Sequence, residues 1–151
     1  MKKSLIILAL MFSCFIATYA QNNESEVATH EFCVLMKDKY DYDVATIQDF
    51  NINKGNSVHF LKTFYSGYNY AIVAFPLEKG VIDMDLYLYD NDGYKLAESA
   101  SEDNIEMIEY TPFTSRDMKI TLKNYNSISA TYSYDFKIIV FYRDNSVVDL
   151  H

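Results

Sequence analysis

Apolar and polar residues alternate with a period of two along most of the chain. The segment 81–89 shows this pattern most clearly, with alternate apolar residues Ile82, Met84, Leu86 and Leu88. Successive side chains of a strand point to opposite faces, so the segment is predicted to be a strand with one buried and one solvated face. Comparable segments, divided by turn residues, lie at 46–52, 57–64, 68–75, 94–98, 105–111, 117–124 and 130–142.

These segments predict an all-β domain, an antiparallel, jelly-roll-like β-sandwich of about eight strands. The turn Asp90-Asn91-Asp92-Gly93 is typical of a hairpin, because Asn and Asp tolerate left-handed backbone conformations and Gly favours them. The residues expected to face inward late in the chain are Met118, Ile120, Leu122, Tyr132, Tyr134, Phe136, Ile138 and Val140.

The residues before the first strand predict one short helix at 23–37. Asn23 and Glu26 have the spacing of a capping box at its start. The acidic stretch 37–43 is interpreted as a connection. The expected organisation is therefore a signal peptide at 1–20, an N-terminal helix and connection at 21–45, the sandwich at 46–144 and a tail at 145–151.

Residues 1–20 have the three parts of a secretory signal peptide. A basic start precedes an apolar run at 5–16, and a short stretch ending in Ala20 follows. The run is shorter than the ~20 residues that cross a bilayer, so we expect cleavage after Ala20 and no integral membrane segment afterwards. The product would be exported, either periplasmic or secreted. In an alternative interpretation, Cys14 is the lipid-modified first residue of a lipoprotein.

The charge balance narrows the choice of partners. The formal net charge is −8 with histidine neutral, and it becomes more negative once the two lysines near the N-terminus leave with the signal. Such a chain repels nucleic acid and anionic membrane surfaces, and it contains no compensating basic cluster. Both are therefore excluded as main partners.

The sequence contains no recognisable catalytic apparatus. His30, His59 and His151 form no metal-binding motif, and no GxSxG motif is present. Cys33, the single cysteine left after signal removal, could contact His30 on a helix, but its apolar neighbours favour simple burial over reactivity or intermolecular pairing. The chain is predicted not to be an enzyme, and a hydrolase is the weakest alternative.

The segment 67–142 resembles the bacterial pre-peptidase C-terminal domain, a β-sandwich family related to the collagen-binding modules of collagenases. The resemblance rests on an acidic alternating strand with its turn at 83–93, on Glu109-Tyr110-Thr111-Pro112, and on the tyrosine-rich closing strand. It implies a jelly-roll-like sandwich with a non-catalytic accessory role in secretion, folding or adhesion.

Two groups of side chains are candidate sites. The first is a candidate calcium site, since carboxylates in a turn suit this ion: Asp83, Asp85, Asp90 and Asp92. An ordinary hairpin beside an acidic strand face is the alternative. The second is a candidate ligand-binding surface, because tyrosine offers a flat apolar ring with a polar hydroxyl: Tyr65, Tyr68, Tyr70, Tyr87 and Tyr89. For each tyrosine, a structural role in the sheet is the alternative.

The sequence therefore favours an exported, non-catalytic β-sandwich that binds a protein or a polysaccharide through surface tyrosines and carboxylates. No cofactor is expected, with calcium as a possible ligand. The alternative is a structural or secretion-accessory protein of the bacterial cell envelope.

Overall fold

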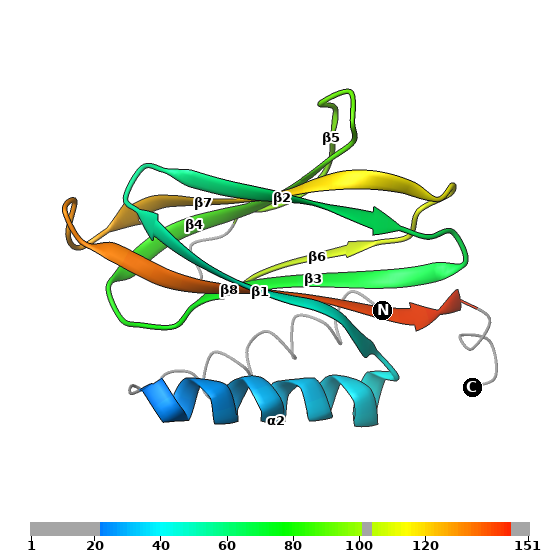
Figure 1. Ribbon diagram of the computed structural model, residues 1–151, viewed down its shortest axis with the longest axis horizontal. Coiled ribbons are helices and arrows are strands. Elements are labelled where there is room, and N and C mark those ends of the chain that lie inside the picture. The colour runs from blue at the N-terminus through cyan, green and yellow to red at the C-terminus, as the bar shows by residue number, and fades with distance from the viewer. Residues whose placement is uncertain (1–21, 101–103, 146–151) are drawn as a thin grey trace.

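The computed structural model describes residues 22–100 and 104–145, so the predicted signal peptide lies outside the described residues. In the described part, one helix, α2 (Asn22–Tyr40), precedes eight strands. These are β1 (Asp43–Asn53), β2 (Ser57–Phe64), β3 (Tyr68–Pro76), β4 (Val81–Tyr89), β5 (Lys95–Ala100), β6 (Glu106–Tyr110), β7 (Arg116–Ser127) and β8 (Ser133–Asp144). They form two antiparallel sheets, β1-β8-β3-β6 and β2-β7-β4-β5, which face each other (Figure 1). The predicted all-β sandwich is confirmed.

Strands β2 and β4 begin and end where the alternation predicts, whereas β7 continues beyond its predicted end at residue 124. The reason is that Asn124 is buried with its polar groups paired. Its side-chain nitrogen donates to the carbonyl of Ile52 at 3.2 Å, and its side-chain oxygen accepts from the hydroxyl of Ser127 at 2.7 Å. A polar residue that looks like a turn signal is thereby accommodated inside a strand.

The main core lies between the two sheets and contains most of the predicted inward residues. Met84, Leu86, Leu88, Met118, Ile120, Leu122, Tyr134, Phe136, Ile138 and Val140 are all buried there. Two predictions are wrong. Ile82 is 49% exposed, because irregular pairing between Val81 and Met84 puts Val81 in the core instead. Tyr132 is exposed and precedes β8, where its hydroxyl donates to Glu78 at 2.9 Å.

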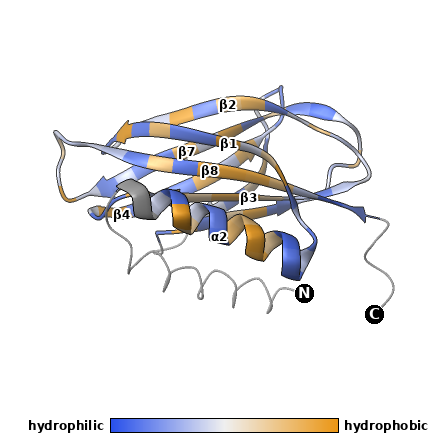
Figure 2. Cartoon of the chain, turned by 60° about the horizontal axis from the view of Figure 1, so that its bottom comes forward, coloured by the Kyte–Doolittle hydropathy of each residue, from blue (hydrophilic) through white to orange (hydrophobic). Residues whose placement is uncertain are grey.

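Helix α2 covers the outer face of the sheet β1-β8-β3-β6 (Figure 2). Phe32 and Met36 of the helix are buried, and the ring of Phe32 meets that of Phe141 edge-on with centroids 5.6 Å apart. The buried residues beneath the helix are Tyr42, Ala71, Val73, Phe75, Ile139 and Phe141. Strands β3 and β8 are consequently buried on both faces, which the alternation alone did not predict.

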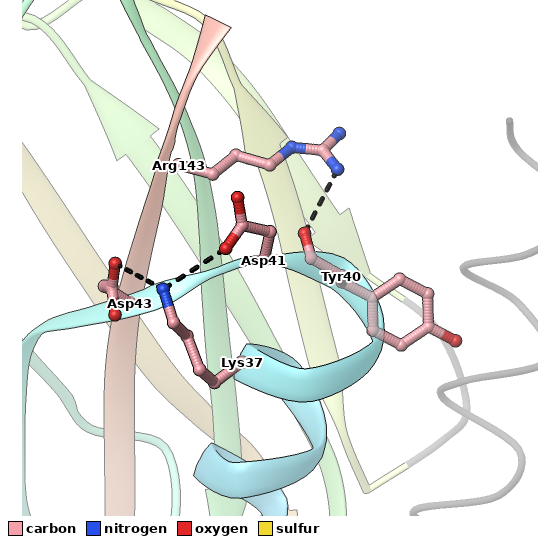
Figure 3. A network of polar contacts seen from close by, with 5 residues as sticks. All are labelled: Lys37, Tyr40, Asp41, Asp43 and Arg143. Atoms are coloured by element: carbon pink, nitrogen blue, oxygen red, sulfur yellow. Dashed lines mark hydrogen bonds and ion pairs between the residues drawn. The ribbon is translucent and has the colours of Figure 1, made fainter. Parts of the chain in front are cut away.

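The helix runs almost directly into β1, so the prediction of a connection at 37–43 is wrong for residues 37–40, which are helical, and for Asp43, which begins β1. Asp41 has a left-handed backbone with φ of 55°, and its amide donates to the carbonyl of Lys37 at 3.1 Å. This conformation ends the helix. The ammonium of Lys37 then bridges Asp41 at 3.2 Å and Asp43 at 2.9 Å (Figure 3).

Arg143 of β8 fastens the same helix end to the sheet. Its Nη1 donates to the carbonyl of Tyr40 at 3.3 Å (Figure 3). Its guanidinium also lies 4.7 Å from the centre of the Tyr42 ring. A cation at a helix C-terminus also opposes the partial negative charge there. The first described element is thus held by the last strand.

We expect Ile120→Asp to prevent folding, because it places a charge in the core at a cost of several kcal/mol. Leu86→Asp should do the same, since Leu86 is equally buried. The control is Thr121→Asp, because Thr121 points out of the same strand. Far-UV circular dichroism and thermal melts distinguish the variants, and a normal melt for Ile120→Asp would contradict the assigned face.

The chain is expected to lose stability above about pH 10, partly through Tyr42. Burial raises the pKa of its phenol above the usual value, which Arg143 only partly opposes. The unfolded chain therefore loses the proton first as the pH rises through 10, so ionisation favours unfolding until the higher folded-state pKa is reached.

Urea melts at pH 8 and pH 11 test this prediction. Tyr42→Phe should lose less stability between the two pH values than the wild type does. Tyr65→Phe, at a solvent-exposed position, should lose as much as the wild type. An equal loss in all three proteins would contradict the role of Tyr42.

Candidate functional site

The outer face of the sheet β2-β7-β4-β5 is the candidate site. Because Met84, Leu86 and Leu88 point into the core, the intervening residues of β4 point outward. The outward residues of β4 face those of β7 in register: Asp85 opposite Lys123, Tyr87 opposite Thr121 and Tyr89 opposite Lys119. Figure 1 shows α2 on the opposite side of the sandwich, away from this face.

Each tyrosine on this face lies beneath a lysine ammonium. Lys119 is 5.1 Å from the ring centre of Tyr89, and Lys95 of β5 is 5.6 Å from that of Tyr87. A third pair follows at the far end of β7, where Lys123 lies 3.7 Å from the centre of the Tyr125 ring. Such cation–π contacts are favourable even at exposed sites. None of these lysines, nor Tyr125, was predicted from the sequence, although Lys119, Lys123 and Tyr125 alternate with the inward residues Ile120 and Leu122 of the same strand.

Hydrogen bonds order the tyrosines further. The hydroxyl of Tyr87 donates to Asp85 at 2.5 Å and lies 3.4 Å from the hydroxyl of Tyr125. Burial, followed by the hydrogen bond to Asp85, raises the pKa of Tyr87, so this phenol stays protonated and acts as a donor. The hydrogen bond with Tyr87, together with Lys123, lowers the pKa of Tyr125.

The other predicted tyrosines do not join this face. Tyr70 is 3% exposed, and its hydroxyl accepts a hydrogen bond from the amide of Tyr65 at 2.9 Å, so it stabilises a turn from inside the core. Tyr68 is half-buried, with its ring edge-on to Tyr142 at 5.6 Å. Tyr65 is exposed at the β2–β3 turn. The five tyrosines therefore belong to different parts of the molecule.

No protein-family model matches the sequence, and no curated protein matches it. Among solved structures, the pre-peptidase C-terminal domain of a collagenase from Bacillus anthracis superimposes with a TM-score of 0.50 at 12% identity. The match covers 63% of this chain and 87% of that domain. The fold is similar to that of a pre-peptidase C-terminal domain. The resemblance inferred from the sequence is thereby supported at the level of the fold.

Two further solved structures are more distant in shape. PliG of Aeromonas hydrophila, a periplasmic inhibitor of g-type lysozyme, has a TM-score of 0.48 at 7% identity, over 65% of this chain and 85% of that one. The Yersinia pseudotuberculosis-derived mitogen has a TM-score of 0.47 at 18% identity, over 69% and 90%.

The four carboxylates of the predicted calcium site do not converge. Asp83 and Asp85 lie within β4, and at about 3.3 Å per residue they are roughly 23 and 16 Å along the chain from Asp90. Oδ1 of Asp90 faces its own turn, accepting from the amides of Asp92 at 3.0 Å and Tyr94 at 2.8 Å. Over residues 22–100 and 104–145, no three acidic, histidine or cysteine side chains are grouped to hold a metal. Calcium binding by the turn alone stays a prediction.

The residues considered for catalysis are also separated. His30 is exposed on α2 and His59 is exposed on β2, on different sides of the sandwich. Cys33 is half-buried, and burial raises the pKa of its thiol despite the nearby Lys137. A raised pKa keeps the thiol protonated, which is the opposite of what a thiolate nucleophile requires.

Within the described residues, no helix has the length and apolarity to cross a membrane.

Asp90→Ala should lower the stability by about 1 kcal/mol, because two backbone amides lose their acceptor. Asp92→Ala is the matched control, since its side chain is exposed in the same turn. Thermal melts in millimolar calcium and in chelator measure both effects. An increase in melting temperature with calcium that Asp90→Ala abolishes would confirm the calcium prediction, and equal melts in both conditions would contradict it.

Proposed function

We propose that the chain is an exported, non-catalytic module that binds a protein partner through the outer face of the sheet β2-β7-β4-β5. The observation that carries the proposal is the ordered array of tyrosines, lysines and Asp85 on that face. A fold of this kind hosts many functions, so the fold does not select one. The face provides aromatic rings, which are enriched in protein interfaces, and holds them in place before a partner binds.

The lysines favour a protein over a polysaccharide. Stacking on a sugar requires a free ring face, but Tyr87, Tyr89 and Tyr125 each have a lysine over the ring. A protein partner can instead place carboxylates and backbone carbonyls against Lys119 and Lys123 while its apolar groups contact the ring edges. The non-catalytic part of the proposal is supported by the protonated Cys33 thiol and by the separation of the histidines.

A role through strand addition is less favoured. Strand β1 forms one edge of its sheet and is long, but its pairing is irregular between Val44 and Thr46. It also carries exposed Asp43 and Asp49, and the latter forms an ion pair with Lys137 at 2.6 Å. Bulges and charges are the features that prevent edge strands from pairing with other chains. The structural envelope role therefore has less support than the binding role.

Chemical cross-linking of the exported chain in its producing cells tests the proposed function. Wild type and Val34→Ser, on the exposed side of α2, should capture the same protein partner. The pair of substitutions Lys119→Glu and Tyr89→Ser should reduce the affinity for that purified partner at least tenfold, as expected for residues in the centre of an interface. Undiminished affinity in that variant would contradict the proposed face.

Intact mass spectrometry of the same chain tests how it is processed for export. A mature chain beginning at Gln21 is expected, which would confirm cleavage after Ala20. A chain beginning at an acylated Cys14 would instead support the lipoprotein alternative.

A further inference from the structure

Three connections lie together at one end of the sandwich. The β2–β3 turn, the β4–β5 turn and the β6–β7 loop all adjoin the start of β7, because Phe64 pairs with Arg116 and Tyr89 pairs with Lys119. Figure 1 shows the β4–β5 turn projecting beyond the sheet β2-β7-β4-β5. The exposed side chains at this end differ in kind from those of the outer face described above.

Each of the three connections exposes one aromatic ring to solvent. Phe113 of the β6–β7 loop is 96% exposed, Tyr94 of the β4–β5 turn is 72% exposed, and Tyr65 of the β2–β3 turn is 56% exposed. A single exposed aromatic residue is ordinary, but one on each of three neighbouring connections is not explained by packing. Over residues 22–100 and 104–145, no lysine or arginine lies over any of these rings.

The connections are held in fixed positions. The amide of Ser66 donates to the hydroxyl of Ser115 at 2.9 Å, which joins the β2–β3 turn to the β6–β7 loop. A second hydrogen bond joins Thr111 of the β6–β7 loop to Asn69 near the start of β3. Asp90 fixes its own turn and lies 3.9 Å from Arg116. Little backbone entropy of these connections therefore remains to be lost when a partner binds.

The charges around the rings favour a cationic partner. Asp92 and Asp117 are exposed at this end. The nearby cations already have partners: the guanidinium of Arg116 is engaged by Asp90 and by the hydroxyl of Tyr110 at 3.4 Å, and the ammonium of Lys95, next to Tyr94, is paired with Glu98. The chain as a whole has a net charge of −8, so its field attracts positive groups. Open aromatic faces bind ammonium and guanidinium groups through their π electrons.

We infer that this end of the sandwich is a second interaction surface, which binds a basic protein segment by placing its arginine or lysine side chains against Phe113 and Tyr94. Asp92 and Asp117 contribute the opposite charge. On the outer face, by contrast, the tyrosines already have cations of the same chain over them. The two surfaces therefore select partners of different charge, and the inference does not depend on the proposed function of the outer face.

Selection of a random peptide library displayed on phage against the exported chain tests the inference. We expect the enriched peptides to be rich in arginine and lysine and to bind more weakly as salt is raised. Phe113→Ser with Tyr94→Ser should reduce their affinity at least tenfold without changing the melting temperature, because both side chains are in solvent. Ile128→Ser, at an exposed apolar position outside these three connections, is the control and should bind normally.

Other results would overturn the inference. These are the absence of enriched peptides, enrichment of neutral or acidic peptides, or equal binding by the wild type and the Phe113 and Tyr94 variant. Binding of a neutral glycan or a zwitterionic vesicle that depends on Phe113 would also overturn it, in favour of those ligands. Lys119→Glu with Tyr89→Ser should leave peptide binding intact, so that failure here and failure of the proposed function remain distinguishable.

Discussion

The burial of strands β3 and β8 on both faces is the constraint on which the rest of the structure depends. Their inner faces meet the opposite sheet, and their outer faces carry apolar residues such as Val73, Phe75, Ile139 and Phe141, which need a cover. Helix α2 supplies it with Phe32 and neighbouring residues. Because a sheet with two apolar faces is stable in water only as a middle layer, the sandwich and the helix form one cooperative unit.

This arrangement makes the two outer faces of the sandwich unequal. One outer face is covered by α2. The other faces water and carries polar and aromatic side chains. On that surface a lysine lies over each tyrosine ring. Within the described residues, by contrast, no lysine or arginine lies over the exposed rings of Tyr65, Tyr94 and Phe113 near the start of β7. The same chain thus carries one surface whose cations face outward and one whose aromatic faces are open.

The alternation of apolar and polar residues predicted the strands well where a strand has one buried face and one solvent-exposed face. It failed where that assumption does not hold. The continuous apolar run Ile138-Ile139-Val140-Phe141 indicates two dry faces, and reading it as an alternation hid the role of the helix. Irregular strand pairing turned the side chain of Ile82 to the solvent face instead of the predicted core face, and no sequence pattern marks such a position. At the candidate site, residue type showed Tyr87 and Tyr89 but could not separate them from buried Tyr70, because the difference lies in tertiary contacts.

The contact between Arg143 and the C-terminal end of α2 has a consequence for the order in which the chain folds. During synthesis the helix emerges before the strands, yet the surface that it covers is completed only by the last strand. Phe32 therefore cannot contact Phe141 until most of the chain has been made. Contacts of such long sequence separation form late and slowly. A chain that emerges from its N-terminus onward therefore keeps an incomplete middle layer until its C-terminal strand is available.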